Sequence, residues 1–310
     1  MKSLYFDKDT KELVFLDRSA LPGAEIYRRI STFREFFDSL ASSSLCGNDA
    51  VFVSAAYIIC AAAYRFEDVT VEGFDYSYGK SIDFLSLQCA SNGVVRSACV
   101  FMKKAEIDRT SVKTMLESIE KAASGIENTV KSHAEALDGM STRLISDGDG
   151  ILVRGNCGEL CTVKYGLSFA PVARAFENGV PFRLYIGETY PSYDGKRLAS
   201  YEASLLGMRH EVIRDSDAAS LMAKGKITKV FIDAVTDGHG NFASSPGSLQ
   251  LAVCCKHYGV PIYAFLPSCP YTDDEKEYDV LDYTLLDGCA AAGVLTDLPM
   301  NDEYDTEKEK

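Results

Sequence analysis

The 310-residue sequence predicts an α/β fold: a Rossmann-like parallel sheet domain preceded by a small mixed α+β N-terminal domain and a helical connector. The first observation is that, after residue 150, short apolar runs alternate with amphipathic segments of helical length. Such alternation implies crossover connections and a parallel sheet with helices on both faces. The second is a long polar segment that separates this half from an opening half of different pattern. The predicted strands cover residues 150–155, 182–188, 210–215, 229–234 and 261–267.

The opening half begins with two alternating runs, residues 3–7 and 12–17, which the polar turn KDTK joins into a predicted β-hairpin. Thr32 is followed three residues later by Glu35, as a capping box requires, so we expect a helix there with one buried aromatic face. Residues 50–64 are nearly all apolar and predict a second helix.

The next two segments complete this half and lead out of it. Residues 68–79, DVTVEGFDYSYG, are expected to be extended up to their glycines. Residues 111–138 space apolar positions among polar ones and predict one or two helices, interrupted or weakened at Gly125. We therefore expect four parts: a small N-terminal domain (1–110), a helical connector (111–145), a Rossmann-like domain (146–300) and a disordered acidic tail (301–310).

Charge and hydropathy exclude two classes of partner. A net charge of -13 argues against nucleic acid, because binding to it depends on Lys and Arg that neutralise phosphates. The longest apolar stretch, residues 50–64, is broken by Ser54 and is shorter than the roughly 20 residues of a membrane span. The N-terminus lacks the apolar core of a signal peptide. We expect a cytoplasmic protein with no nucleic-acid and no membrane partner.

Ten cysteines are scattered through apolar segments, as buried thiols are in a large chain. Cys254 and Cys255 lie near His257, but no second ligand pair has zinc-like spacing, so we expect no metal and no cofactor. Cys157 and Cys161 would share one face of a helix opening near residue 157. This spacing permits a redox pair, although core cysteines show it too.

Ligands of parallel sheets bind at the carboxyl ends of the strands, where helix N-termini present free N–H groups. Three polar or glycine-rich segments fall there: residues 155–162, 188–197 and 233–248. The polar side chains that we expect to converge are Arg154, Glu188, Lys196, Arg197, Asp233, Asp237 and His239.

Three stretches resemble methylthioribose-1-phosphate isomerases: LDRSALP (16–22), GELCTVKYG (158–166) and a long run from YIGETYPSYDGKR to KVFIDA (185–234). That family is similar in architecture to ribose-1,5-bisphosphate isomerases and to the alpha, beta and delta subunits of eukaryotic initiation factor 2B. The resemblance implies the fold predicted above, usually in homodimers, and a small sugar-like or sugar-phosphate-like ligand. It does not by itself imply catalysis.

The resemblance also implies a catalytic pair, a Cys and an Asp, which moves protons during aldose-to-ketose isomerisation. The position that matches the family's Cys is Gly155, and Cys157 lies two residues further on. The family's Asp falls on Ala234 or Val235. The candidates for a displaced catalytic pair are therefore Cys157 with Asp233 or Asp237.

The family's phosphate-binding cations are altered as well. Cys46 replaces an arginine, while Gly47 is kept. Tyr78 replaces a second arginine, with Lys80 nearby. Asp194 stands for a glutamine, and Ser244 with Ser245 for an Asn-Lys pair. The residues that the resemblance and the loop pattern assign to ligand binding are Arg154, Asn156, Gly158, Glu188, Asp194, Arg197, Gly47 and Lys80.

Two hypotheses follow from the sequence. The first is a non-catalytic relative, or pseudoenzyme, that binds a metabolite or a protein partner. The second is an active aldose-ketose isomerase on an altered substrate, using Cys157 and Asp233 or Asp237.

Overall fold

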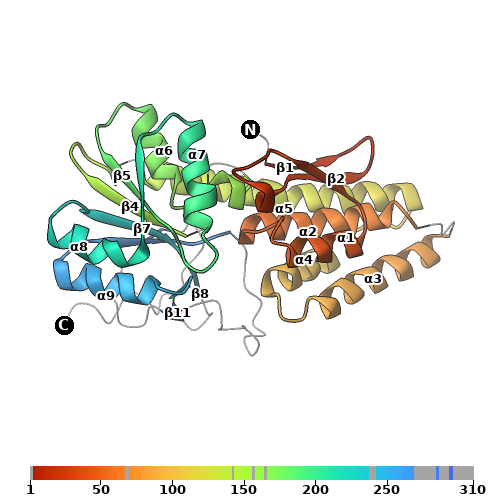
Figure 1. Ribbon diagram of the computed structural model, residues 1–310. Coiled ribbons are helices and arrows are strands. Elements are labelled where there is room, and N and C mark those ends of the chain that lie inside the picture. The colour runs from red at the N-terminus through yellow and green to blue at the C-terminus, as the bar shows by residue number, and fades with distance from the viewer. Residues whose placement is uncertain are drawn as a thin grey trace.

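The computed structural model describes residues 3–66, 70–141, 143–155, 158–163, 166–236, 242–268, 284–285 and 293–295. A small three-stranded antiparallel sheet and a helical group form one end of the molecule, and a parallel sheet with flanking helices forms the other (Figure 1). No helix within these ranges is long and apolar enough to cross a membrane.

The predicted hairpin is confirmed. Strands β1 (Leu4–Asp7) and β2 (Glu12–Leu16) pair antiparallel, and β3 (Tyr27–Ile30), which we did not predict, extends the sheet beyond β2. A short 3-10 helix, η1 (Arg18–Ala20), follows β2, and the side chain of Asp17 caps it.

The N-terminal helices pack around α2. They are α1 (Phe33–Ala41), α2 (Asn48–Ala63), α3 (Val71–Gln88) and α4 (Gly93–Lys104). The capping box is confirmed, because Glu35 N donates to Thr32 Oγ1 and Thr32 N donates to Glu35 Oε2. All but one residue of α2 is buried, as its apolar composition requires.

The expectation that residues 68–79 are extended is wrong over the part that the structure describes, residues 70–79. Thr70 caps α3 through a hydrogen bond to the Gly73 backbone N–H at 3.1 Å, and the helix continues to Gln88. Phe74, Tyr78 and Ile82 recur every four residues and are buried against the N-terminal core. This helical spacing outweighs the β-like run at the start of the segment.

The connector forms one long helix, α5 (Val112–Ser141), which continues through Gly125. A side chain at Gly125 would meet nothing within 4 Å, so packing does not require a glycine there, and the glycine costs backbone entropy. The helix packs against α2 at one end and against α6 (Ala170–Glu177) at the other (Figure 1). It therefore joins the two ends of the molecule. The domain boundaries at residues 110 and 145 stay predictions.

All five predicted strands form one parallel sheet, which confirms the fold class. The strand order is β12-β10-β7-β4-β5-β6, with β4 at the centre beside β7. The strands are β4 (Gly150–Arg154), β5 (Arg183–Gly187), β6 (His210–Ile213), β7 (Lys229–Asp233), β10 (Ile262–Phe265) and β12 (Gly293–Leu295).

Helices cover both faces of this sheet. On one face, α6 and α7 (Ser200–Leu205) share a core with Ile151 and Val153 of β4. On the other, α8 (Ala218–Ala223) and α9 (Ser248–Tyr258) share a core with Leu152. The alternation along β4 is the two-residue period of a strand that is buried on both sides.

The segment 233–248, one of the three polar or glycine-rich segments expected at the carboxyl ends of the strands, contains two short strands, β8 (Val235–Thr236) and β9 (Phe242–Ser244). They pair antiparallel with each other, and β9 also pairs with β11 (Thr284–Leu285). The remaining short elements are η2 (Glu159–Cys161), a π-helical turn η3 (Gly195–Ala199) and η4 (Asp215–Asp217).

Candidate functional site

The carboxyl ends of β4 and β7 bring a glycine and an acid together. Arg154 of β4 pairs with Ile232 of β7, so the following residues, Gly155 and Asp233, lie side by side. Gly155 has φ +111°, a conformation that favours glycine. A Cβ atom built on Gly155 would stand 3.6 Å from Asp233 Oδ2.

Asp233 carries a carboxyl group that is only half satisfied. Its Oδ1 accepts the backbone N–H of Ser168 at 3.1 Å. Its Oδ2 is buried and has no hydrogen-bond partner in the described part of the chain. Burial raises the pKa of Asp233 to about 7; the Ser168 hydrogen bond opposes this shift, and the nearby Asp49 carboxylate adds to it. An acid with such a pKa can give or take a proton near neutral pH.

Asp49 comes from the other end of the molecule. It lies in the first turn of α2, is 1% exposed, and accepts hydrogen bonds from the backbone and hydroxyl of Ser268 at 3.2 and 3.0 Å. Ser268 follows β10, so this contact attaches the N-terminus of α2 to the edge of the sheet where Asp233 lies.

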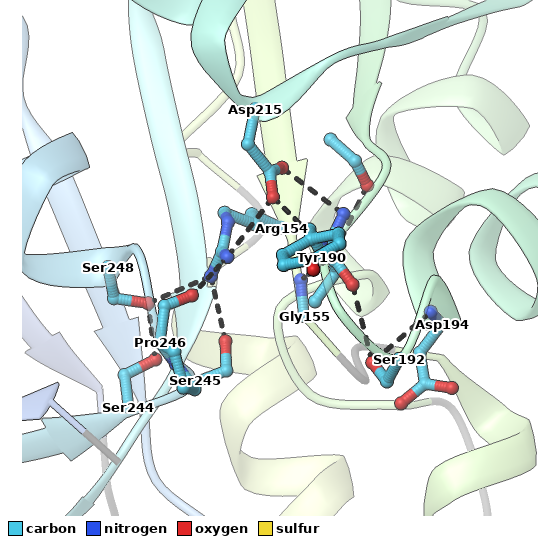
Figure 2. Close-up of polar contacts among 12 residues, drawn as sticks. Arg154, Gly155, Tyr190, Ser192, Asp194, Asp215, Ser244, Ser245, Pro246 and Ser248 are labelled. Atoms are coloured by element: carbon cyan, nitrogen blue, oxygen red, sulfur yellow. Dashed lines mark hydrogen bonds and ion pairs between the residues drawn. The ribbon is translucent and has the colours of Figure 1, made fainter. Parts of the chain in front are cut away.

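Arg154 lies beside this pair, and its guanidinium is largely occupied. Figure 2 shows it between Asp215 and the loop before α9. Its Nη1 donates to the hydroxyls of Ser245 and Ser248 at 2.8 and 3.1 Å. Its Nη2 donates to the carbonyl of Pro246 and to Asp215 Oδ2, the latter at 3.3 Å. Arg154 therefore holds the loop that the sequence assigned to phosphate binding.

Asp215 in turn orders the loop after β5. Its Oδ1 accepts the N–H of Thr189 at 3.1 Å, and its Oδ2 accepts the N–H of Tyr190 at 2.9 Å (Figure 2). The hydroxyl of Thr189 accepts the N–H of Gly155 at 3.2 Å. Thr189 has φ +61°, an uncommon conformation for a residue with a side chain. These bonds connect the loops after β4 and β5.

Gly47 places the N-terminus of α2 against the turn after β4. Gly47 has φ +90°, and a Cβ atom there would lie 2.2 Å from the Cys161 carbonyl oxygen, so only glycine permits this approach. Cys46 packs against the same small core as Cys161. Burial raises the pKa of the Cys161 thiol well above its usual value, and its hydrogen bond with Cys46 adds to the shift.

Gly158 permits a second close approach. A Cβ atom there would lie 2.2 Å from the carboxylate oxygens of Glu202 on α7. These oxygens accept the N–H groups of Glu159 and Leu160 at 2.7 and 3.0 Å. Burial raises the pKa of Glu202 to about 7, although these two hydrogen bonds oppose the shift. Gly158 thus gives the Glu202 carboxylate access to the 3-10 turn.

The other predicted ligand-binding residues are dispersed. Arg197 donates to the carbonyls of Arg18 and Leu21 at 2.6 and 3.5 Å and lies 4.0 Å from Asp194. The N–H of Glu188 continues the β5–β6 pairing by donating to the Ile213 carbonyl. Lys196 is exposed in the π-helical turn.

Lys80 lies apart from this cluster. It is exposed on α3, where its ammonium stands 5.6 Å from the Tyr76 ring, and α3 is far from the parallel sheet in Figure 1. Tyr78 is buried on the same helix and donates to the Met102 carbonyl at 3.0 Å.

Four of the predicted site residues lie outside the described residues: Asn156, Cys157, Asp237 and His239. The helix expected to carry Cys157 and Cys161 on one face is not formed over the described part. Residues 159–161 make a single 3-10 turn that begins after Gly158, and the residues beyond Cys161 do not continue it. The i, i+4 argument for a redox pair therefore does not apply.

Sequence reasoning missed three charged residues: Arg18, Glu202 and Asp215. Arg18 and Asp215 each begin a 3-10 turn two residues after a strand, between polar or charged neighbours, and Glu202 lies inside α7. No local pattern of the sequence marks the first two as charges that pack inside the protein.

The described residues hold no cluster of metal ligands, and the cavity beside Arg154 is small. No group of three or more His, Cys, Asp or Glu side chains there is placed to hold a metal ion. A cavity of about 30 Å³ lies beside Arg154, Asp215 and Gly247, which is room for water but not for a sugar.

Comparisons with known proteins agree with this architecture. The 5-deoxyribose 1-phosphate isomerase of Bacillus cereus is 29% identical over 260 residues, which are 83% of this chain and 75% of that protein. The methylthioribose-1-phosphate isomerase of Parabacteroides distasonis is 28% identical over 86% of this chain and 83% of that protein.

Solved structures show the same fold. The 5-methylthioribose 1-phosphate isomerase of Pyrococcus horikoshii superposes with a TM-score of 0.80 at 21% identity, covering 96% of this chain and 91% of that one. The delta subunit of translation initiation factor eIF-2B from A. fulgidus superposes with a TM-score of 0.73 at 25% identity, covering 86% of this chain and 77% of that one.

The fold, a parallel sheet joined to an N-terminal group of helices, is therefore that of an isomerase-like class whose solved structures also include an initiation factor subunit. Within that class, the chain belongs to the initiation factor 2 subunit family, whose model matches residues 45–276.

Proposed function

We propose that this protein is a non-catalytic relative of the sugar-phosphate isomerases and that it binds a small sugar-like or sugar-phosphate-like molecule at the carboxyl edge of β4 and β7. One observation carries the proposal. The position that the resemblance assigns to the family's cysteine is Gly155, and its missing side chain would point at Asp233. Isomerisation by this family's route uses two proton-transferring groups, and Gly155 with Ala234 or Val235 can supply neither.

The cations of the site support the same proposal. The guanidiniums of Arg154 and Arg197 are engaged by protein oxygens, and Cys46 contributes no charge at the position of a family arginine. A buried dianion needs several charge-assisted hydrogen bonds, each worth roughly 1.5 to 3 kcal/mol. Fewer cations are thus available at this edge to hold the phosphate dianion of the family's substrates tightly, whereas the fold that forms the edge is kept.

The experiment separates binding from turnover. The purified protein is titrated by calorimetry with methylthioribose 1-phosphate and 5-deoxyribose 1-phosphate, and each mixture is followed by NMR for the ketose product. The Bacillus cereus enzyme serves as the positive control. Binding without product formation is the expected result, and product at an enzyme-like rate would refute the non-catalytic assignment.

A second candidate function is an active isomerase on an altered substrate. The unpartnered Oδ2 of Asp233 favours it, because a buried carboxyl with a pKa near 7 is suited to proton transfer. In this case Asp233→Asn, which keeps the shape of the side chain, abolishes turnover while binding persists. Cys157→Ala tests the predicted partner of Asp233 in the same assay, and turnover unaffected by both changes rules this candidate out.

We also propose that the protein acts as a homodimer in the cytoplasm. Relatives in the family assemble, as the solved tetrameric eIF2B-beta2-delta2 complex from C. thermophilum shows for that protein. Leu249 and Val253, one turn apart on α9, are 36% and 54% exposed and offer an apolar surface for such contact. Light scattering coupled to size exclusion tests the proposal; a monomer at micromolar concentration contradicts it.

A further inference from the structure

One buried cation lies outside the network of Figure 2. Arg18, in the 3-10 turn after β2, is 0% exposed. Its Nε donates to the Leu160 carbonyl, but Nη1 and Nη2 have no hydrogen-bond partner in the part of the chain that the structure describes. A guanidinium presents five N–H donors, and buried polar groups are almost always satisfied. The four N–H donors of Arg18 Nη1 and Nη2 therefore await an acceptor.

The backbone of Arg18 is fixed on both sides. Its N–H donates to the Ser44 carbonyl at 3.0 Å, and its own carbonyl accepts Arg197 Nη2 at 2.6 Å. The adjacent acid, Asp17, already accepts from Ser19 and from Arg28, whose Nε lies 2.6 Å away. Arg18 is thus held in place, and Asp17 is engaged elsewhere.

Glu202, a buried acid from another element, does not occupy Arg18 either. Glu202 lies close enough for the charge of Arg18 to influence its pKa. Its two oxygens, however, accept the N–H groups of Glu159 and Leu160. These bonds direct the carboxylate toward the 3-10 turn after Gly158, so it leaves the terminal nitrogens of Arg18 without a partner.

Arg18 lies beside the turn that follows β4. Leu160, its carbonyl partner, is five residues beyond Gly155 in the loop that follows β4. The charge of Arg18 also acts on the thiol of Cys161, against which Gly47 and the N-terminus of α2 pack. The guanidinium therefore lies where the N-terminal elements meet the carboxyl edge of the sheet.

We propose that Arg18 is the anion-binding residue of this site, and that Nη1 and Nη2 make a two-point contact with two oxygens of a ligand's phosphate or carboxylate group. The inference rests on the proposed function, because it requires a small molecule at this edge. The planar fork of a guanidinium matches such paired oxygens. The shared chemistry is an oxyanion on a sugar-like molecule.

The test compares three sugars that differ in charge. Wild-type protein is titrated by calorimetry with ribose 5-phosphate, with ribonate and with uncharged ribose. At least one anionic sugar is expected to bind about tenfold or more tightly than ribose, as a charge-assisted two-point contact implies. Arg18→Lys, which keeps the charge but loses the fork, removes most of this preference. Arg28→Lys, at the neighbouring exposed arginine, keeps it.

The outcomes are distinct. A preference for ribose 5-phosphate identifies the ligand's charged group as a phosphate, and a preference for ribonate identifies it as a carboxylate. Either preference supports Arg18 as the binding residue if Arg18→Lys removes that preference. Binding of ribose with no preference for either anion, or a preference intact in Arg18→Lys, overturns the inference and leaves the proposed function standing. Failure of all three sugars and of both isomerase substrates to bind removes the proposed function itself.

A measurement on the unaltered protein covers the case in which Arg18 variants do not fold. The side-chain Nε–H resonance of Arg18 is followed by NMR during the same titrations. It shifts with the anionic sugar that binds and stays in place with ribose. A resonance that does not move at saturation overturns the inference.

Discussion

Asp233 Oδ2 lies 3.6 Å from the point where a Cβ atom on Gly155 would stand, and no described group satisfies it. The relationship arises because β4 and β7 are neighbours in the sheet and end at the same level. It places a buried acid directly opposite a position without a side chain.

The contributions of Asp233 and Glu202 to stability should fall as the pH rises from about 4 to about 7. Burial raises the pKa of Asp233 from 3.8 to about 7 and that of Glu202 from 4.5 to about 7. In this window the folded state keeps protons that the unfolded state has lost, so each group lowers the free energy of unfolding by up to about 1.4 kcal/mol per pH unit. Below the unfolded pKa values of 3.8 and 4.5, both carboxyls are protonated in the folded and the unfolded chain, so stability is not reduced by either group.

Urea denaturation at half-unit pH steps measures this slope. Asp233→Asn should make it shallower, because the Asp233 contribution disappears. Asp83→Asn, at an exposed acid whose pKa is lowered by Lys103, should leave the slope between pH 4.5 and 7 unchanged. A slope that is equal in wild type and Asp233→Asn contradicts the assigned pKa shift.

Gly47→Ala should destabilise the protein by about 2 kcal/mol or more, because the new methyl group would meet the Cys161 backbone at 2.2 to 2.7 Å and the residue has φ +90°. Gly79→Ala is the matched control. Gly79 lies inside α3 with nothing within 4 Å of its Cβ position, so alanine should stabilise by up to about 1 kcal/mol. Two melting curves with opposite shifts are expected; a neutral Gly47→Ala excludes the close approach.

Gly158→Ala should also destabilise, through a clash with Glu202 rather than through backbone strain. A double-mutant cycle separates the two causes. Glu202→Ala removes the carboxylate, so the additional cost of Gly158→Ala in that background should be smaller by about 1 kcal/mol or more. Strictly additive effects in chemical denaturation argue against the contact.

Arg154→Met should cost about 3 kcal/mol, because it leaves the hydroxyls of Ser245 and Ser248 and the carboxylate of Asp215 without their donor. The side chain of Arg154 is 3% exposed. Arg214→Met offers the comparison. Arg214 pairs with Asp217 at 2.9 Å on the surface, where ion pairs contribute little to stability. The melting temperature of the Arg214→Met variant should therefore hardly differ from that of the wild type. Equal effects of the two changes contradict the assigned role of Arg154.

Much of the fold was readable in the sequence because it depends on local patterns. The five apolar runs predict parallel strands, and Thr32 with Glu35 predicts the start of α1, since periodicity and capping act within a few residues. The prediction of an extended segment at residues 68–79 is wrong for the same reason. Their first residues have β-like character, whereas packing of Phe74 and Tyr78 against the N-terminal core decides for a helix.

The sequence by itself determined the α/β class, five of the six described strands of the parallel sheet and the edge at which the polar loops gather, because hydrophobic periodicity selects each of these elements. Only the tertiary structure decided what the charged groups do. Arg154 meets Asp215 across 61 residues, and Arg18 meets Leu160 across 142. The shifted pKa values of Asp233 and Glu202 follow from burial, and burial exists only after distant segments have packed together.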